Sequence, residues 1–242
     1  MTESCPANSV IDPPARTLAR RVAAHWRFKL FVGTALTVAF LALYLLLQRH
    51  TIRPATLMPL SALDRWIGFR PGAAVLYESL WLYIPIGPWL LTRRAELDSY
   101  CRILAVMSCA GFAVFLLWPT CVPRPATPPD CHMFRILTLI DGPGNACPSM
   151  HAAVAVFSGA CVHTVCGWLG DRGYFRALSW VWCAGILYAT LATKQHVAVD
   201  LVSGCALGAL GALAWWRQVQ RRGDSPHKDV CHCRLTSSAR NG

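Results

Sequence analysis

The stretch LFVGTALTVAFLALYLLL, Leu30–Leu47, has 18 consecutive residues without a charge. A helix needs about 20 apolar residues to cross the hydrocarbon core of a bilayer. The whole chain of 242 residues has the same character, since 55% of its residues are hydrophobic and 14% are charged. An average soluble domain carries about 25% charged residues. The sequence therefore predicts a membrane protein, and a soluble helical bundle with an unusually apolar core is the less favoured alternative.

Five further stretches have the composition of a membrane span, because each carries at most one charged residue. They are Ala73–Leu91, Ile103–Trp118, Ala152–Leu169, Tyr174–Ala192 and Val199–Trp216. We therefore expect an all-α fold, a six-transmembrane-helix integral membrane bundle over residues 30–216. A basic N-terminal tail, residues 1–29, precedes this domain, and a basic C-terminal tail, residues 217–242, follows it.

The positions of Lys and Arg predict how the bundle is oriented. These residues concentrate in the two tails, in the loop at 93–102 and in the turn at 171–176. The positive-inside rule then places both termini in the cytoplasm, and the loops at 48–72, 119–150 and 193–197 face the opposite side. We expect an integral protein of a bacterial inner membrane. The net charge of +11 reflects this distribution, and no aromatic-interleaved basic patch indicates binding to nucleic acid.

Three polar stretches lie on the predicted outer side of the membrane. They are WPTCVPRP, which contains Arg124; NACPSMHAAV, which contains Ser149 and His151; and TKQHVAVD, which contains Lys194, His196 and Asp200. The first outer loop is also long enough for a short interfacial helix near residues 60–67. Charged groups at the edge of a membrane span are costly to retain and usually functional. These stretches are therefore the candidate site.

Two histidines, one of them paired with a carboxylate, suit phosphoryl transfer. His196 is the candidate nucleophile, and Asp200, four residues later on the same helix face, would orient its ring. His151 would protonate the leaving group and later activate the acceptor. All three are expected to be catalytic.

The remaining polar groups are expected to bind phosphate. Arg124 offers a planar fork of donors and Lys194 offers a point charge. Ser149 and the backbone N–H of Met150 would lie at the start of a helix, where the helix dipole favours an anion. No metal site and no cofactor are predicted.

The stretches CPSMHAAVAVFSG and KQHVAVDLVSG resemble the second and third signature motifs of the type 2 phosphatidic acid phosphatase superfamily. LDRWIGF, YESLWLY and WPTCVPRP are similar to the branch of inositol phosphorylceramide synthases and their bacterial relatives. The resemblance covers roughly Pro59–Gly211. It implies a covalent phosphohistidine without a metal, and it carries the family's roles onto the matching positions. These are Arg124, Ser149, His151, His196 and Asp200.

The chain departs from the family pattern at two places. Leu117 stands where the family has a lysine, seven residues before Arg124. Ala189 and Thr190 stand where the family has a Ser-Arg pair, ahead of the nucleophilic histidine. Two cationic phosphate ligands are therefore missing from their usual places, and Lys194 is the candidate replacement for one of them.

The resemblance and the candidate residues together predict a lipid-phosphate phosphatase or phosphotransferase. Its partners would be the bilayer and a lipid phosphate substrate. One alternative is a head-group transferase of the inositol phosphorylceramide synthase type. Others are a membrane protein that binds lipid phosphate without chemistry and, more remotely, a vanadate-dependent peroxidase. The identity of the lipid and the oligomeric state stay open.

Cysteine placement raises two minor possibilities. Cys121, Cys131 and Cys147 share one outer loop, so one disulfide is possible if that side is oxidising. The stretch HKDVCHC at 227–233 could hold a metal, but it lies in a polar chain end without a second ligand cluster. We expect that stretch to be an unstructured tail.

Overall fold

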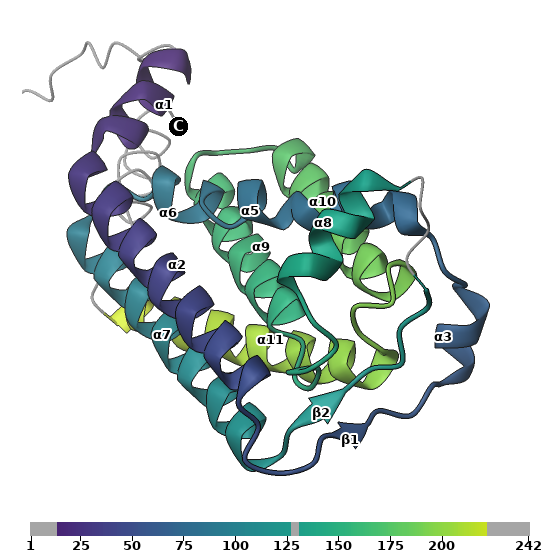
Figure 1. Ribbon diagram of the computed structural model, residues 1–242. Coiled ribbons are helices and arrows are strands. Elements are labelled where there is room, and N and C mark those ends of the chain that lie inside the picture. The colour runs from purple at the N-terminus through teal and green to yellow at the C-terminus, as the bar shows by residue number, and fades with distance from the viewer. Residues whose placement is uncertain (1–13, 127–130, 222–242) are drawn as a thin grey trace, which may run out of the picture.

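The computed structural model describes residues 14–126 and 131–221 (Figure 1). These residues are mostly helical, which confirms the predicted helical class. Two strands of two residues each, β1 (Thr56–Leu57) and β2 (Thr120–Cys121), pair in parallel near the loops. The outer parts of both predicted tails, with the HKDVCHC stretch, lie outside the described residues.

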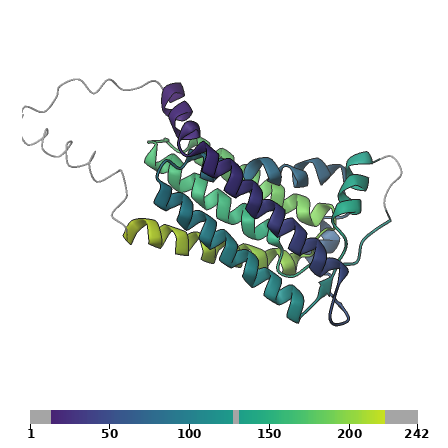
Figure 2. The same ribbon diagram turned by 60° about the vertical axis from the view of Figure 1, so that its left-hand side comes forward.

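Five helices of the described chain are long and apolar enough to cross a membrane. They are α2 (Trp26–Arg49), α7 (Arg94–Leu117), α9 (Met150–Trp168), α10 (Tyr174–Ala192) and α11 (Ala198–Arg221). Their mean hydropathy ranges from 1.3 to 2.4. The long helices run side by side along one common direction (Figure 2). The composition and length of these helices fit an integral membrane protein.

The segment that we predicted as the second span, Ala73–Leu91, is not one continuous helix. It consists of a 3₁₀ turn, η1 (Pro71–Ala73), and of α4 (Ala74–Glu78), α5 (Leu80–Tyr83) and α6 (Ile86–Leu90). Pro85 lies at the break between α5 and α6, where its missing N–H interrupts the helical ladder, and Ser79 separates α4 from α5. The prediction of six spanning helices is therefore not confirmed.

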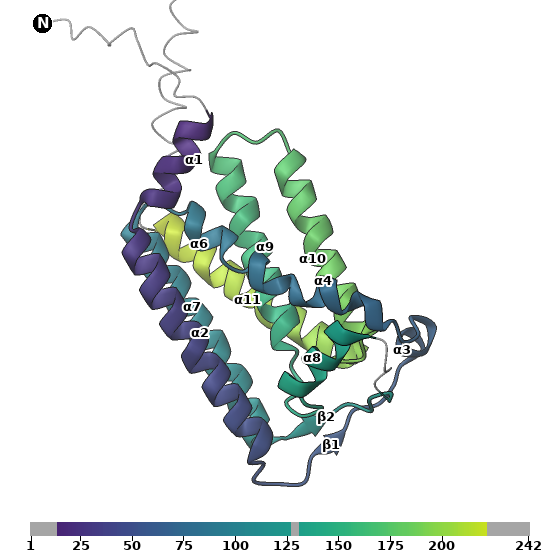
Figure 3. The same ribbon diagram turned by 45° about the horizontal axis from the view of Figure 1, so that its top comes forward.

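The broken segment nevertheless runs the length of the bundle (Figure 3). At its start, the backbone N–H of Arg70 donates to the carbonyl of Ala192, at the end of α10, over 2.7 Å. At its other end, the carbonyl of Leu90 accepts from Arg21 of α1 (Pro14–Ala23) over 2.9 Å. The segment therefore returns the chain from the C-terminal end of α2 to its N-terminal end. The described parts of the loops at 48–72, 119–150 and 193–197 thus lie at the opposite end of the bundle from α1.

Two short helices lie at the loop end of the bundle. α3 (Ala62–Trp66) begins at Ser61, whose side chain and that of Asp64 form a capping box. It occupies the place of the interfacial helix that the sequence predicts near residues 60–67. The second, α8 (His132–Ile140), packs on α4. Together with β1 and β2, these elements form the border of the candidate site.

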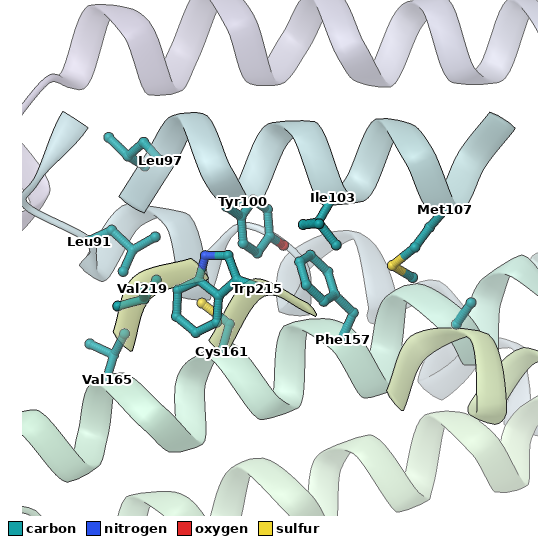
Figure 4. Packing of buried hydrophobic residues seen from close by; sticks show 11 residues of the cluster. Leu91, Leu97, Tyr100, Ile103, Met107, Phe157, Cys161, Val165, Trp215 and Val219 are labelled. Atoms are coloured by element: carbon teal, nitrogen blue, oxygen red, sulfur yellow. The ribbon is translucent and has the colours of Figure 1, made fainter. Parts of the chain in front are cut away.

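Helices α7, α9 and α11 enclose the largest buried apolar cluster (Figure 4). Trp215 of α11 lies within it, and the rings of Tyr100 and Phe157 stack there with centroids 4.8 Å apart. Two glycines bring α11 still closer to α9. A Cβ on Gly204 would lie 2.2 Å from the carbonyl oxygen of Ser149, and one on Gly208 would lie 2.3 Å from that of Ala153. Such close backbone approach is typical of small residues spaced four apart in membrane helices.

Candidate active site

The N-terminal ends of α9 and α11 bring the two histidine motifs together. Ser149 caps α9, since its side-chain oxygen accepts from the N–H of Ala152 over 3.3 Å. The backbone N–H of Ser149 donates to the carbonyl of Asp200 over 3.0 Å. The rings of His151 and His196 then lie 5.7 Å apart, centroid to centroid. Residues from the second and third sequence motifs therefore face each other.

His196 is buried, and its ring is held by the backbone. Its Nδ1 lies 3.0 Å from the carbonyl oxygen of Ala146 and 3.7 Å from Oδ2 of Asp200. A carbonyl only accepts hydrogen bonds, so this contact requires the proton to be on Nδ1. Nε2 then carries the lone pair, and it has no hydrogen-bond partner among the described residues. The direct partner of the ring is thus Ala146, whose role no sequence pattern indicated.

Asp200 is fully buried beside this ring. Its Oδ2 accepts from the backbone N–H of Val197 over 3.0 Å, while Oδ1 has no partner among the described residues. A carboxylate at 3.7 Å from Nδ1 lies close enough to stabilise a positive charge on the imidazole. The contact between His196 and Asp200 is therefore electrostatic in this structure.

His151 contacts a buried carboxylate through a tyrosine. The hydroxyl of Tyr77 lies 3.0 Å from Nδ1 of His151 and donates to Oδ2 of Asp141 over 2.8 Å. Tyr44 donates to the other oxygen of Asp141, also over 2.8 Å. Burial alone would raise the pKa of Asp141, but the neighbouring histidines, the guanidinium of Arg124 and the hydrogen bond from Tyr44 together hold that pKa below its usual value.

Sequence reasoning missed Asp141 and both tyrosines. Asp141 ends α8 in a loop of glycine and proline, and each tyrosine lies in an apolar segment. Tyrosines are common in such segments as packing residues. The three side chains come from α2, from α4 and from the residue that follows α8, so only the folded arrangement reveals that they meet.

Arg124 lies half-buried beside the same carboxylate. Its Nη1 donates to the carbonyl of Asp141, and its Nη2 donates to that of Gly142 over 2.6 Å. Its Nε is buried without a partner among the described residues. We expected the guanidinium of Arg124 to bind phosphate. In the structure both of its terminal nitrogens bind the loop at Asp141 and Gly142, and its Nε–H is left to bind a ligand.

Lys194 binds a neighbouring helix. Its ammonium donates to the backbone carbonyl of Asp64 in α3. Partial burial lowers the pKa of Lys194, and the charge of Asp64 offsets this in part. The carboxylate of Asp64 accepts from the N–H of Ala198, the first residue of α11, over 2.8 Å. Lys194 thus helps to anchor α3 beside the link that carries His196.

The buried side-chain atoms without partners gather at this site. Among the described residues, such atoms belong to five side chains, those of Arg21, Arg124, Gln195, His196 and Asp200. Only Arg21 lies at the other end of the bundle. An unpartnered buried polar group costs roughly 1–3 kcal/mol, so a cluster of them needs an explanation. Four of these five side chains belong to, or lie next to, the residues that the sequence motifs single out.

Gln195 is the residue of this group that sequence reasoning missed. It is 1% exposed, and neither its Nε2 nor its Oε1 has a partner among the described residues. Its only sequence signal is a place between Lys194 and His196. The side chain of Met150, in contrast, packs in the apolar cluster around Tyr44. The part of Met150 that we assigned to phosphate is its backbone N–H, at the first position of α9.

The positions that depart from the family pattern supply no cation here. Leu117 ends α7 and is 62% exposed. Ala189 and Thr190 are fully buried in α10. The carbonyl of Thr190 accepts the backbone N–H groups of Gln195 and His196, each over 3.2 Å. Position 190 therefore shapes the link to His196 through its backbone.

The three cysteines of the loop at 119–150, Cys121, Cys131 and Cys147, are free thiols in the structure. The thiol of Cys147 lies 3.3 Å from the hydroxyl of Ser203 in α11. The disulfide that the sequence allows is thus not formed here.

A family model described as "PAP2 superfamily" matches residues 99–224, just over half of the chain. The match extends from α7 to the end of α11 and includes the three polar stretches of the site. No curated protein and no solved structure matches the chain.

Proposed function

Because the chain belongs to the PAP2 superfamily, we propose that it is a membrane lipid-phosphate phosphatase or phosphotransferase that works through a phosphohistidine. His196 would be the nucleophile, and the site would face the extracytoplasmic side. The supporting observation is the free Nε2 of His196, with its ring 5.7 Å from that of His151 and unpartnered polar atoms around it.

In the first step, Nε2 of His196 attacks phosphorus and the bond from phosphorus to the ester oxygen breaks. His151, protonated, gives its Nε2 proton to that oxygen, and the alcohol leaves. The charge of Asp200 stabilises the positive ring that forms on His196. The Nε–H of Arg124 and the donors at the start of α9, from Ser149 and Met150, would hold the phosphate oxygens.

In the second step, water or another alcohol attacks phosphorus. His151, now neutral, takes the proton from the attacking oxygen, and the bond from phosphorus to His196 breaks. Both histidines then return to their starting states. Lys194 would contribute its charge from a distance, since its ammonium binds the carbonyl of Asp64.

The shortage of cations favours a second candidate, head-group transfer between a phosphodiester and an alcohol. A phosphate monoester carries nearly two negative charges near neutral pH, whereas a diester carries one. Positions 117 and 190 hold leucine and threonine here. Among the described residues, Arg124 is the arginine whose charge acts on His151. A buried site with less positive charge suits the singly charged ester better. The resemblance to inositol phosphorylceramide synthases agrees with this candidate.

The test uses the purified full-length protein in lipid vesicles, with radiolabelled phosphatidic acid as the monoester and phosphatidylinositol as the diester. Each is supplied with and without ceramide as the acceptor alcohol. A phosphatase should release inorganic phosphate from phosphatidic acid. A transferase should form a labelled ceramide product from phosphatidylinositol. A base-stable, acid-labile phosphoprotein should form in either reaction.

His196→Ala should abolish both turnover and the labelled protein. His163→Ala is the matched control, because that histidine lies in α9 outside the site and accepts from Trp180 over 3.2 Å. Full turnover by His196→Ala would disprove the covalent mechanism. Binding of either lipid by the unmodified protein without any turnover would instead support the non-catalytic alternative. Vanadate should inhibit the active protein, because it imitates five-coordinate phosphorus.

A further inference from the structure

The hydrogen bonds around Tyr77 determine where His151 carries its proton. The hydroxyl of Tyr77 has a single hydrogen, which it donates to Oδ2 of Asp141 over 2.8 Å. Toward Nδ1 of His151, 3.0 Å away, the same oxygen can therefore only accept. The proton must then be on Nδ1. The neutral ring keeps its lone pair on Nε2, and the charged ring has a transferable proton on Nε2.

Several contacts hold the Asp141 carboxylate in a fixed position relative to His151. Tyr44 of α2 donates to its Oδ1 over 2.8 Å. Arg124 donates to its backbone carbonyl and places a positive charge beside it. The ring of Tyr77 lies 4.4 Å from that of His151, centroid to centroid. The carboxylate and the tyrosine are buried and the histidine is half-buried, and the three side chains form one connected chain.

We propose that Asp141, acting through Tyr77, is a positioning residue that keeps the proton of His151 on Nδ1 and stabilises its positively charged form. This inference rests on the proposed function, in which Nε2 of His151 first gives and later takes a proton. With Nδ1 permanently protonated, the ring needs neither a flip nor a change of tautomer between the two steps. The negative charge of Asp141 favours the state that donates to the leaving group.

The first test compares two soluble monoesters, p-nitrophenyl phosphate and an alkyl phosphate. Nitrophenolate leaves without help, whereas an alkoxide needs a proton from the acid. In Asp141→Asn and Tyr77→Phe, turnover of the alkyl ester should fall by about 100-fold. Turnover of the nitrophenyl ester should change by less than about threefold. The rates compared are those of single-turnover phosphoenzyme formation, because the second step is the same for both esters. An equal loss on both esters in that step, or no loss on either, would overturn the proposal.

The pH profile gives a second kinetic readout. The titratable or charged groups that face His151 are Tyr77, Asp141, Arg124 and His196. Because Asp141 favours the protonated ring, its replacement by asparagine should move the alkaline limb of alkyl ester turnover to lower pH. Arg124 and His196 remain in this variant, so a displaced limb reports on Asp141. An unmoved limb would contradict the proposed action on the proton of His151.

A third measurement needs no turnover. In protein labelled with ¹⁵N-histidine, the signal of His151 can be assigned by its loss in His151→Asn, and its nitrogen shifts report the tautomer. We expect protonation on Nδ1 in the unmodified protein and a mixture of tautomers in Tyr77→Phe. If the unmodified protein turns over no ester, the proposed function fails, but these shifts still decide the inference. An unchanged tautomer in Tyr77→Phe would refute it.

Tyr83→Phe is the matched control for all three measurements. Tyr83 is also buried, and its hydroxyl contacts Ser179 of α10, with 3.0 Å to the carbonyl. Its loss removes a buried tyrosine hydroxyl outside the site. We expect the ester selectivity, the alkaline limb and the tautomer of His151 to stay unchanged in this variant. Thermal unfolding of each variant separates loss of fold from loss of chemistry.

Discussion

Gln195 is a buried amide with no partner, one residue before the proposed nucleophile. Its side chain is 1% exposed, and neither polar atom is paired within the described part of the chain. Leaving such a group unsatisfied lowers the free energy of unfolding by roughly 1–3 kcal/mol. We therefore propose that this amide contacts the substrate, since it contributes no hydrogen bond to the described fold.

Replacing Gln195 with leucine, which has a similar size and no polar atoms, separates stability from function. We expect the free energy of unfolding to stay equal or to rise by about 1 kcal/mol, because an unpaired amide is removed. Turnover of the lipid phosphate should fall at least about tenfold, as for a lost hydrogen bond to substrate. Thermal unfolding in detergent and release of phosphate measure the two effects. A stable Gln195→Leu with full turnover would contradict the assignment.

At this residue scale, the sequence predicted the residues that occur in motifs and missed those that do not. Ser149, His151, His196 and Asp200 meet in the structure because each pair lies at the start of one helix, and those starts pack together. Asp141 and the carbonyl of Ala146 act through tertiary contacts between distant segments. Such contacts leave no periodic or compositional signal in the chain.

At the scale of elements, Asp64 joins α3 to α11. Its Oδ2 accepts from the N–H and the hydroxyl of Ser61, over 2.8 and 2.6 Å, while its Oδ1 accepts from Ala198 over 2.8 Å. One carboxylate thus caps two helix starts. The link that carries His196 lies directly before the second of them.

Asp64→Ala should remove both caps together. We expect a loss of about 1–2 kcal/mol in the free energy of unfolding for a lost N-cap, together with reduced turnover. Asp98→Ala is the control, because Asp98 pairs with Arg94 on the exposed face of α7 over 2.9 Å. Loss of such an exposed pair should cost no more than about 1 kcal/mol. Chemical denaturation measures the free energy of unfolding of both variants. Equal stability of Asp64→Ala and Asp98→Ala would show that the two caps contribute little.

The glycines of α11 offer a second test at this scale. An alanine at Gly204 would place its Cβ 2.2 Å from the carbonyl oxygen of Ser149, so the start of α9 would have to move. We expect Gly204→Ala to lose roughly 1–3 kcal/mol of stability, as overpacked sites do, and to lose turnover as well. Gly33→Ala is the control, since a Cβ there meets nothing within 4 Å. Retained turnover in Gly204→Ala would show that the approach of α9 and α11 is adjustable.

Hydropathy predicted five of the long helices but not the broken segment at 71–90. Summed hydropathy averages Pro85 and Pro88 with the apolar residues around them and takes no account of their missing N–H groups. Where a segment has no internal proline, as in α2, α7 and α10, composition and helix agree. The sequence therefore determined which segments are apolar, and backbone hydrogen bonding determined which of these are continuous.

For the whole molecule, the number of membrane crossings decides on which sides the termini lie. Five long helices alone would put the two termini on opposite sides, whereas a crossing by residues 71–90 would return them to one side. The contact of Leu90 with Arg21 favours the second arrangement. We therefore expect both termini in the cytoplasm, in agreement with the positive-inside rule.

Fluorescent protein fusions at the two termini test this topology. A fusion that stays in the cytoplasm folds and fluoresces, whereas one that is exported unfolded stays dark. Both fusions should fluoresce. A fusion inserted in the loop after Arg53 is the control and should stay dark, since this loop lies at the other end of the bundle. A dark C-terminal fusion beside a bright N-terminal one would show that residues 71–90 do not cross.

The bond from the N–H of Ser149 to the carbonyl of Asp200, at 3.0 Å, has a consequence for how the protein responds to its membrane. It ties the starts of α9 and α11 into one rigid unit, so a thicker or thinner bilayer would tilt both helices together. The distance between the two histidine rings should then stay the same when the acyl chains of the bilayer lipids are longer or shorter. Turnover of a water-soluble ester should stay constant across vesicles of different thickness, while delivery of a lipid substrate from the leaflet should vary.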